Sequence, residues 1–515
     1  MPKRAARLTG PDISLDQYAR APLYRQLYER LRAEILEGQL EAGARLPSTR
    51  ALASQLGVSR NTTALAYQQL LLEGYLESRV GDGTRVAQMH PEHLARISGK
   101  VARRTPRHAE PPASHPAQPA QSAQLSRRGR LVAALPYPDQ LYAGLPDGEK
   151  PVFRVGQPDV AHFPHETWAR LVARHARQLA RVDSSYQKVQ GYLPLREAIA
   201  AHIGITRGVH CSPEQIIVTA GSQGALDLVA RVLLDPGDRA WVEDPGYMGA
   251  FGALLAAGAD LVPVPVDGEG IIVDVGRRLY PHARLAVVTP SHQFPTGVTM
   301  CLSRRLALLQ WAREARAWVA EDDYDSEYRY SGRPLEALQG LDGGERVIYI
   351  GTFSKVLLPA LRLGYLVAPA DLVEGFIAAR RFIDVHMPSL EQMALADFIA
   401  GGHFARHLRR MRAIYHERRD ALVAALTHEL GDLVEVGVPE AGMHLVAWLP
   451  EGMSGQRVAH QAAALGLRVL TTTRNHPETH RREGLLLGFA SDTPEELRAG
   501  VHTLARALRT MTISR

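Results

Sequence analysis

The sequence predicts two folded parts: a small N-terminal helical domain that ends in a β-hairpin, and a large α/β domain with a mostly parallel central sheet. Its 515 residues suit one small and one large domain. A stretch rich in Pro, Ala, Ser and Gln, almost without large apolar residues, separates two parts of ordinary globular composition. From about residue 151, helix and strand patterns alternate, which is typical of parallel sheets covered by helices. We predict domains at 20–88 and 151–511, joined by a basic Pro/Ala-rich linker at 89–150.

Composition excludes several classes of protein. Hydrophobic residues make up 45% of the chain and charged residues 22%, so most of it can bury a core and is not disordered. The two cysteines, Cys211 and Cys301, cannot form a disulfide framework and lack the paired spacing of a zinc site. The sequence contains no apolar run long enough for a membrane span and no secretory signal. We therefore expect a cytoplasmic protein without a membrane partner.

The positive charge is concentrated in one window. The net charge is +6 and the isoelectric point is near 9.3. In the window 100–130, Glu110 is the only acidic residue beside a set of basic ones. This pattern is typical of a solvated basic linker, or of a tether that also contacts nucleic-acid phosphates. The basic residues of this window are Lys100, Arg103, Arg104, Arg107, Arg127, Arg128 and Arg130.

The first two helices of the small domain follow from spacing and capping. A second helix is predicted from residue 49 to about residue 56. Ser48 is its N-cap, and Gly57 ends it in a left-handed conformation. The first helix is predicted by apolar residues that share one face at a spacing of four, namely Leu23, Leu27, Leu31 and Ile35.

A third helix and a hairpin complete this domain. The helix is predicted from residue 60 to about residue 73, with Ser59 as its N-cap and Gly74 at its end. Two short helices joined by a three-residue turn form a helix-turn-helix. Strand patterns at 75–80 and 84–87 flank a Gly-Asp-Gly turn and predict a β-hairpin. The unit is therefore a winged helix-turn-helix.

The start of the third helix and the tip of the wing are suited to contact DNA. A recognition helix enters the major groove by its N-terminal end, and Arg and Asn pair with base edges there. Taken singly, each residue is equally compatible with an ordinary polar cap. Together, the run from residue 22 to 84 resembles the GntR family of bacterial transcription regulators, which implies a double-stranded DNA operator as partner. The candidate DNA-binding residues are Arg50, Ser59, Arg60, Asn61, Thr62, Gly83 and Thr84.

The large domain contains a lysine that stands out against its composition. From residue 189 to the end, Lys355 is the only lysine among many arginines. An amine can attack a carbonyl and form a Schiff base, whereas a guanidinium does not. Scarcity alone is equally compatible with a chance surface lysine. However, Lys355 follows a buried-type strand at 347–350. Thr352 and Ser354 supply hydroxyls there, and Arg362 supplies a cation, which together suit a phosphate dianion.

Three further sequence motifs supply a phosphate-binding turn, a carboxylate and two phenols. After the strand at 216–219, the turn Gly221-Ser222-Gln223 can cradle a phosphate with backbone N–H groups. After the strand at 318–320, Asp322 can pair with a protonated pyridine nitrogen, and the Tyr324 phenol can hydrogen-bond a ring hydroxyl. Tyr247 can stack on a flat ring. Each string alone is typical of an ordinary strand-end loop. Together they describe a pocket for pyridoxal 5′-phosphate.

These strings resemble the fold-type I aminotransferases over about residues 153–489. The resemblance implies that Lys355 forms the Schiff base with the cofactor and that the residues above hold it. Two departures put ordinary amino-acid turnover in doubt. Phe294 stands where the family has an Asn that contacts the ring oxygen, and His292 or Gln293 are the candidate substitutes. Leu486 stands where the family has an arginine for the substrate carboxylate, and the candidate replacements are Arg474, Arg481 and Arg482.

The two halves together resemble the MocR subfamily of GntR regulators. This resemblance implies a homodimer, often head-to-tail, whose large domain senses pyridoxal 5′-phosphate, an amine or an amino acid through an aldimine. Two alternatives stay open: a catalytically active aminotransferase with a DNA-binding appendage, and a DNA-binding protein with a cofactor-free large domain. No metal site is predicted. Neither His403 with His407 nor His476 with His480 is followed by the glutamate that a zinc hydrolase needs.

Overall fold

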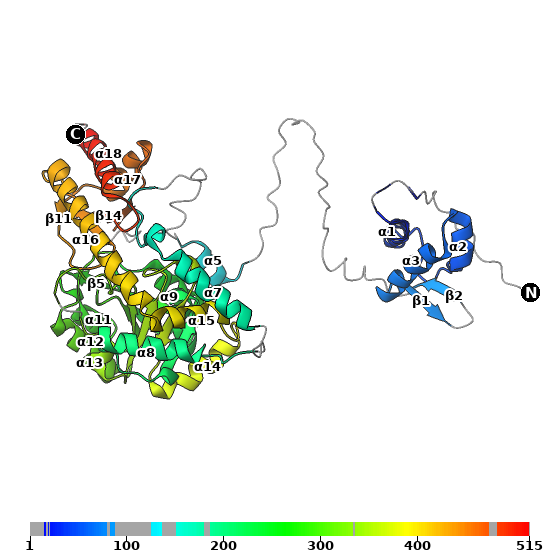
Figure 1. Ribbon diagram of the computed structural model, residues 1–515, viewed down its shortest axis with the longest axis horizontal. Coiled ribbons are helices and arrows are strands. Elements are labelled where there is room, and N and C mark those ends of the chain that lie inside the picture. Colours follow the sequence, from blue (N-terminus) through cyan, green and yellow to red (C-terminus); the bar gives the residue numbers. More distant parts are fainter. Residues whose placement is uncertain are drawn as a thin grey trace, which may run out of the picture. The chain divides into compact units, whose positions relative to one another are not determined.

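The computed structural model describes residues 15–16, 19, 21–79, 83–87, 125–135, 151–179, 186–332, 335–472 and 482–513. The chain divides into two compact units, Met1–Ala120 and Gln121–Arg515. Figure 1 draws the first unit in blue and the second in cyan to red. Each unit has hydrophobic clusters of its own, one in the small unit and three in the large one. The units are therefore described separately.

The small unit is a three-helix domain with a two-stranded wing. Ser48 accepts a hydrogen bond from the Ala51 N–H at 3.2 Å, and Ser59 accepts one from the Thr62 N–H at 3.1 Å, so both predicted N-caps are present. Gly57 adopts a φ of 66° after the second helix, as expected. The turn predicted at Gly81 and Asp82 lies outside the described residues. The elements are α1 (Leu23–Leu36), α2 (Thr49–Leu56), α3 (Arg60–Leu72), β1 (Leu76–Arg79) and β2 (Gly83–Val86).

Two side-chain hydroxyls hold α3 against the start of α2. Thr63 is fully buried, and its Oγ1 donates to the Thr49 carbonyl at 2.8 Å. The Tyr67 hydroxyl donates to the Pro47 carbonyl at 2.9 Å, just before α2. Both contacts tie the third helix to the start of the second one. The helix-turn-helix geometry therefore depends on polar contacts as well as on the apolar core.

The large unit is built on an eight-stranded sheet in the order β3-β10-β9-β8-β7-β4-β5-β6. The pairs among β5, β4, β7, β8 and β9 are parallel, whereas β10 is antiparallel to both of its neighbours. The expected mostly parallel sheet is therefore confirmed. Its strands are β3 (Ile216–Thr219), β4 (Arg239–Asp244), β5 (Asp260–Asp267), β6 (Gly270–Ile271), β7 (Leu285–Val288), β8 (Trp318–Asp323), β9 (Val347–Thr352) and β10 (Gly364–Val367).

Helices pack against this sheet because its strands are apolar on both faces. Along β4, the consecutive residues Trp241 and Val242 belong to different hydrophobic clusters, so each face carries its own core. The helices are α7 (His165–Leu179), α8 (Leu193–Arg207), α9 (Gly221–Leu233), α10 (Met248–Ala257), α11 (Val273–Leu279), α12 (Leu302–Ala315), α13 (Leu338–Asp342), α14 (Val373–Arg381), α15 (Ser389–Ala400), α16 (His403–Leu430), α17 (Gly455–Ala464) and α18 (Pro494–Ile513).

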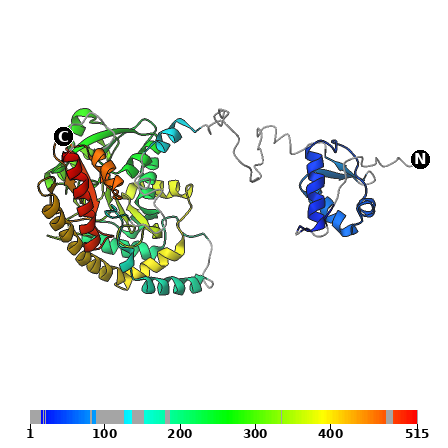
Figure 2. The same ribbon diagram turned by 90° about the horizontal axis from the view of Figure 1, so that it is seen from above.

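A second, four-stranded antiparallel sheet lies near the end of the chain, in the order β11-β12-β14-β13. Figure 2 shows α18 in red and α16 in orange-brown, which pack against each other beside this sheet. The sequence analysis did not separate this sheet from the central one, because its strands are short. They are β11 (Glu435–Val436), β12 (His444–Trp448), β13 (Leu470–Thr471) and β14 (Gly484–Gly488).

One helix, α5 (Arg127–Ala133), lies in the stretch predicted as linker. Ser126 caps it by accepting from the Gly129 N–H at 3.0 Å. The helix packs on α10, where Arg128 donates to the Ala256 carbonyl at 3.3 Å. The sequence analysis missed this helix because it weighed the stretch by overall composition. Residues 89–124 and 136–150 of the predicted linker lie outside the described residues. None of the described helices is long and apolar enough to cross a membrane.

Candidate functional site

Lys355 lies in the loop that follows β9, beside the carboxyl end of β8. Its Nζ donates to the Gly156 carbonyl at 2.8 Å. Gly156 has a φ of 70°, and a Cβ there would lie 2.9 Å from the lysine Nζ. A larger residue would therefore displace the amine. Asp322 on β8 pairs with Ile350 on β9, so this loop and the Asp322 carboxyl belong to adjacent strand ends.

The Asp322 carboxyl is buried with one oxygen unsatisfied. The residue is 4% exposed, and its Oδ1 has no hydrogen-bond partner among the described residues. Burial, followed by the neighbouring Asp323, raises the pKa of Asp322 to about 7, although the Lys355 amine opposes the shift. Asp322 and Tyr247 line the same small cavity. A buried acceptor of this kind is costly unless a donor meets it. A protonated ring nitrogen has the required chemistry.

The candidate phosphate-binding residues Gly221, Ser222 and Arg362 lie together at the start of α9. Helix α9 starts at Gly221, so the predicted turn forms the first turn of this helix and its N–H groups are available to an anion. Arg362 donates to the Ala220 carbonyl at 2.9 Å, and a Cβ on Gly221 would lie 3.3 Å from its guanidinium. Ser222 is partly buried in the same turn. These groups suit a phosphate dianion.

The two hydroxyls before Lys355 lie in the same loop. Thr352 Oγ1 accepts from the Ser354 N–H at 3.2 Å, so Thr352 also shapes the loop. Ser354 Oγ is buried and has no partner among the described residues. Like the Asp322 oxygen, it is a polar atom whose surroundings leave it unsatisfied. The residues present therefore fit a phosphorylated pyridine at both of its ends.

Gln223 and Tyr247 contact each other. The Tyr247 hydroxyl donates to Gln223 Oε1 at 3.4 Å, and Gln223 Nε2 donates to the Gly249 carbonyl at 2.9 Å. The Gln223 side chain thus holds the start of α10, and only its backbone N–H remains for an anion. The Tyr247 ring meets Phe294 edge-on, with centroids 6.0 Å apart. Tyr247 is therefore fixed by neighbours on two sides.

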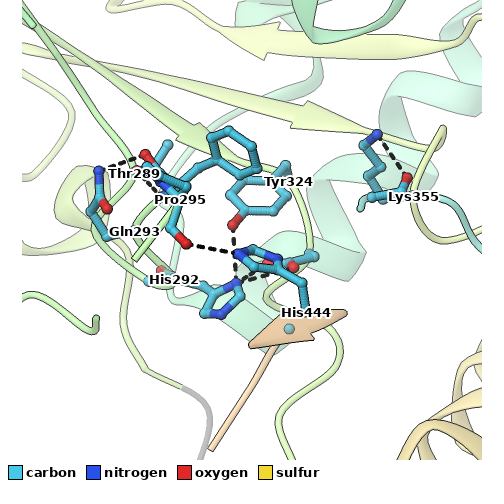
Figure 3. Close-up of polar contacts among 12 residues, drawn as sticks. Thr289, His292, Gln293, Pro295, Tyr324, Lys355 and His444 are labelled. Atoms are coloured by element: carbon cyan, nitrogen blue, oxygen red, sulfur yellow. Dashed lines mark hydrogen bonds and ion pairs between the residues drawn. The ribbon is translucent and has the colours of Figure 1, made fainter. Parts of the chain in front are cut away.

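Tyr324 belongs to a buried polar cluster. Its hydroxyl lies 3.0 Å from His292 Nδ1, and the same nitrogen lies 3.1 Å from both carboxylate oxygens of Asp325. His444 on β12 donates from Nε2 to the Pro295 carbonyl at 3.0 Å, and burial lowers its pKa to about 3. Figure 3 shows the Tyr324 hydroxyl pointing to the His292 ring. The sequence analysis missed Asp325 and His444 as members of this cluster.

The two candidates proposed for the missing Asn differ in their surroundings. Gln293 Nε2 donates to Glu243, to the Pro245 carbonyl and to the Phe294 carbonyl. Its Oε1 accepts from both the N–H and the hydroxyl of Thr296. The side-chain amide of Gln293 is therefore fully hydrogen-bonded, whereas His292 contacts Tyr324. Asp325 adjoins the Tyr324 string and was in principle visible, but nothing in the sequence brings residue 444 to residue 292.

Leu486 occupies a buried position in β14 that faces the site. It pairs directly with Val446, two residues from His444 on β12, so all three side chains share one face. His444 contacts Pro295 and Phe294, which shows that this face is turned towards the site. Arg482 donates instead to the Leu449 carbonyl and forms an ion pair with Glu435. The other two candidate replacements, Arg474 and Arg481, lie outside the described residues.

The candidate DNA-binding residues lie on three elements of the small unit. Arg50 is in the first turn of α2, Gly83 and Thr84 begin β2, and the others begin α3 or cap it. Arg50, Ser59, Arg60 and Asn61 are exposed. Ser59 Oγ also hydrogen-bonds Thr62 Oγ1 at 2.8 Å, so this pair shapes the helix start. The sequence analysis missed Arg45, which lies against Gly83 at the wing, 3.3 Å from where a Cβ would be.

Of the two histidine pairs, His403 and His407 lie within the described residues. His407 is buried on α16 against the Phe163 ring, at a centroid distance of 5.9 Å, and burial lowers its pKa to about 4. It therefore has the surroundings of a core histidine. His476 and His480 lie outside the described residues.

Comparisons with known proteins place both units in families. Residues 151–504 match the family Aminotransferase class I and II, and residues 23–86 match Bacterial regulatory proteins, gntR family. The chain is 44% identical to the probable rhizopine catabolism regulatory protein MocR of Rhizobium meliloti, over 96% of this chain and 95% of the relative. It is 32% identical to the pyridoxine biosynthesis transcriptional regulator PdxR of Corynebacterium glutamicum, over 94% and 96%.

A solved structure is similar to the large unit. The α-aminoadipate aminotransferase LysN of Thermus thermophilus, complexed with N-(5′-phosphopyridoxyl)-L-leucine, matches with a TM-score of 0.65 and 32% identity. The match covers 73% of this chain and 95% of that one. An aminotransferase fold and a DNA-binding head thus occur in one chain, and the regulators named above share both over nearly their whole length.

Proposed function

Because this chain belongs to the MocR subfamily of GntR-type transcription regulators, we propose that its large domain holds pyridoxal 5′-phosphate on Lys355 and uses it to sense a small amine. The effector class comprises primary amines, amino acids and the vitamer itself. The DNA-binding head reads an operator through Arg60 and Asn61 at the start of α3. The observation that carries the proposal is the buried Asp322 carboxyl, whose Oδ1 lacks a partner among the described residues at the strand end beside Lys355.

The proposed roles follow from the contacts. Asp322 would hold a pyridine nitrogen in its protonated form, and Tyr247 would stack on the ring. Arg362, Gly221, Ser222, the Gln223 backbone, Thr352 and Ser354 would hold the phosphate. When bound, the cofactor supplies an aldehyde that condenses with primary amines and a ring that accepts electrons. Lys355 Nζ, now hydrogen-bonded to the Gly156 carbonyl, is the chain's own amine for that aldehyde.

Leu486 favours sensing over turnover. A guanidinium binds a carboxylate with two parallel hydrogen bonds, and a leucine cannot replace it. The buried Leu486 on the site-facing side of β14 therefore removes the charge that would fix an amino acid for repeated reaction. Two relatives are named as regulators of rhizopine catabolism and of pyridoxine biosynthesis, which supports a response to small metabolites.

Sensing requires two arrangements of the protein with different affinity for the ligand. We place these arrangements in a homodimer, in which two heads meet two operator half-sites. A ligand that binds both arrangements equally shifts neither, however tightly it binds. The effector must therefore contact a part of the site that changes between them.

The first test traps the cofactor. The protein is incubated with pyridoxal 5′-phosphate, treated with borohydride and digested for mass spectrometry. We expect one adduct, on Lys355, and none in Lys355→Ala. The exposed Lys188 offers the matched control, because Lys188→Ala should retain the adduct in full. Wild-type protein without an adduct at residue 355 would refute the proposal.

The second test connects the site to DNA. Operator binding is measured at fixed salt while amines with and without a carboxylate are titrated into the cofactor-loaded protein. We expect at least one amine to change the affinity in wild type and in Lys188→Ala, and none to do so in Lys355→Ala. An equal response in Lys355→Ala would show that the effector acts elsewhere. Steady formation of keto acid would favour the aminotransferase alternative.

A further inference from the structure

The polar cluster around Tyr324 contains a histidine and a carboxylate to which the proposed function assigns no role. His292 is 2% exposed and Asp325 is 1% exposed. They lie on different segments, since His292 follows β7 and Asp325 follows β8. Such buried polar groups are retained in a fold only when they are satisfied by each other or by a ligand.

We assign the hydrogen between these two groups to His292 Nδ1. Both Asp325 oxygens lie 3.1 Å from this nitrogen, and a carboxylate accepts hydrogen bonds. In this tautomer His292 Nδ1 donates to Asp325. The Tyr324 oxygen, 3.0 Å from the same nitrogen, then faces an N–H and cannot donate its own hydrogen to it. The Tyr324 O–H is thus left to donate to another acceptor.

We propose that His292, held by Asp325, is a positioning residue. It orients the Tyr324 hydroxyl so that its O–H donates a hydrogen bond to the ring oxygen of the cofactor. This inference rests on the proposed function, because it assumes the ring is present. The pair His292 and Asp325 would replace the Asn that contacts the ring oxygen in the aminotransferase family. Phe294 stands at the position of that Asn. Gln293 is unsuited to it, because its amide is fully engaged with Glu243, Thr296 and backbone carbonyls.

A metal site is the other use of this cluster. Donor atoms of His292, Asp325 and His444 all lie within 4.8 Å of one another, and the three residues are buried. A metal requires a bare ring nitrogen. His292 Nδ1 contacts Asp325 and His444 Nε2 donates to the Pro295 carbonyl at 3.0 Å, so neither of these two nitrogens is bare. His292 Nε2 has no partner among the described residues, but a metal there would leave the contacts of Nδ1 with Asp325 and Tyr324 in place, so the positioning role does not depend on its absence.

The test reads the proton equilibrium of the cofactor-loaded protein. A hydrogen-bond donor to the ring oxygen stabilises the negative charge on that oxygen. The oxygen then attracts the neighbouring proton of the lysine adduct less strongly, so the pKa of that proton is lower. Removing the donor should raise the pH midpoint of the visible absorbance. We expect an increase of about one pH unit in Tyr324→Phe and a smaller increase in His292→Asn.

The decisive comparison is the double variant. If His292 acts through Tyr324, adding His292→Asn to Tyr324→Phe should leave the midpoint where Tyr324→Phe alone puts it. An unchanged midpoint in single His292→Asn, or an equal shift with and without Tyr324, would overturn the proposal. His292→Gln repeats the measurement should His292→Asn not fold. Loss of the adduct at Lys355 in the wild type would instead mark failure of the proposed function.

A matched control separates this role from general packing. His444 is as buried as His292 and its ring lies 4.9 Å away, but it hydrogen-bonds Pro295 and not Tyr324. His444→Asn should leave the midpoint at its wild-type value, and a shift as large as that of His292→Asn would contradict the proposal. The titratable and charged groups around Tyr324 are Asp322, Asp323 and Asp325 beside it, Glu243 from β4, His292 after β7, Lys355 after β9 and His444 from β12.

Discussion

At the scale of the residue, Asp322 combines burial with an unsatisfied oxygen. Its pKa of about 7 in the folded protein lies well above the ordinary value of 3.8. Between these two values the folded protein retains a proton that the unfolded chain has lost. Asp322 therefore contributes a decrease in the stability of the cofactor-free protein as pH rises from about 4 to about 7. A cationic ring nitrogen next to the same carboxyl would stabilise its ionised form.

Asp322→Asn should remove this pH dependence. In cofactor-free protein, we expect the free energy of unfolding of the variant relative to wild type to increase between pH 4 and pH 7, by at most about 4 kcal/mol. Denaturant unfolding at several pH values measures it. Glu321 and Glu327, whose pKa values are also raised by burial, are present in both proteins, so their contributions cancel. A difference that does not change with pH would contradict the prediction.

At the scale of the element, the Thr63 hydroxyl is one of two that hold α3 against the start of α2. Thr63→Val keeps the shape of the side chain but removes the hydroxyl that donates to the Thr49 carbonyl. We expect a loss of about 0.5 to 1.5 kcal/mol in the stability of this domain. Thr63→Ser, which keeps the hydroxyl, should lose less. Thermal unfolding of both variants measures the difference, and equal losses would show that the methyl group and not the hydroxyl matters.

The elements of the small domain were predictable because their signals are local. Ser48, Gly57 and Ser59 mark helix ends within a few residues, and the structure begins α2 and α3 where these caps indicate. In the large domain, the strings around Asp322 and Lys355 were visible because strand ends of a parallel sheet meet at one edge. The antiparallel insertion of β10 was not visible, since it depends on pairing between distant strands.

The parts of the site that escaped prediction depend on tertiary register. His444 approaches His292 only because β12 pairs with β14 in the second sheet. The face of the sheet on which Leu486 lies follows from the same pairing. A shift of the strand register by one residue would place its side chain on the other face. Helix α5 escaped for another reason: its capping Ser126 lies next to a stretch whose composition is typical of a linker.

At the scale of the whole molecule, the two units should unfold separately. The cluster around Leu31 and Tyr67 in the small unit shares no residue with the clusters of the large one. We expect two transitions in scanning calorimetry. Saturating pyridoxal 5′-phosphate should raise only the transition of the large unit, because a ligand stabilises the domain that binds it. A single transition that moves as a whole would show that the units are coupled more tightly than their cores indicate.

Helix α10 touches the pocket at one end and the docked α5 at the other. Tyr247 precedes its first residue, and the Ala256 carbonyl that accepts from Arg128 lies near its last. Its ten residues form a rod about 15 Å long. The helix thus connects the ring proposed to stack on the cofactor with α5, the first described helix after the small unit in sequence.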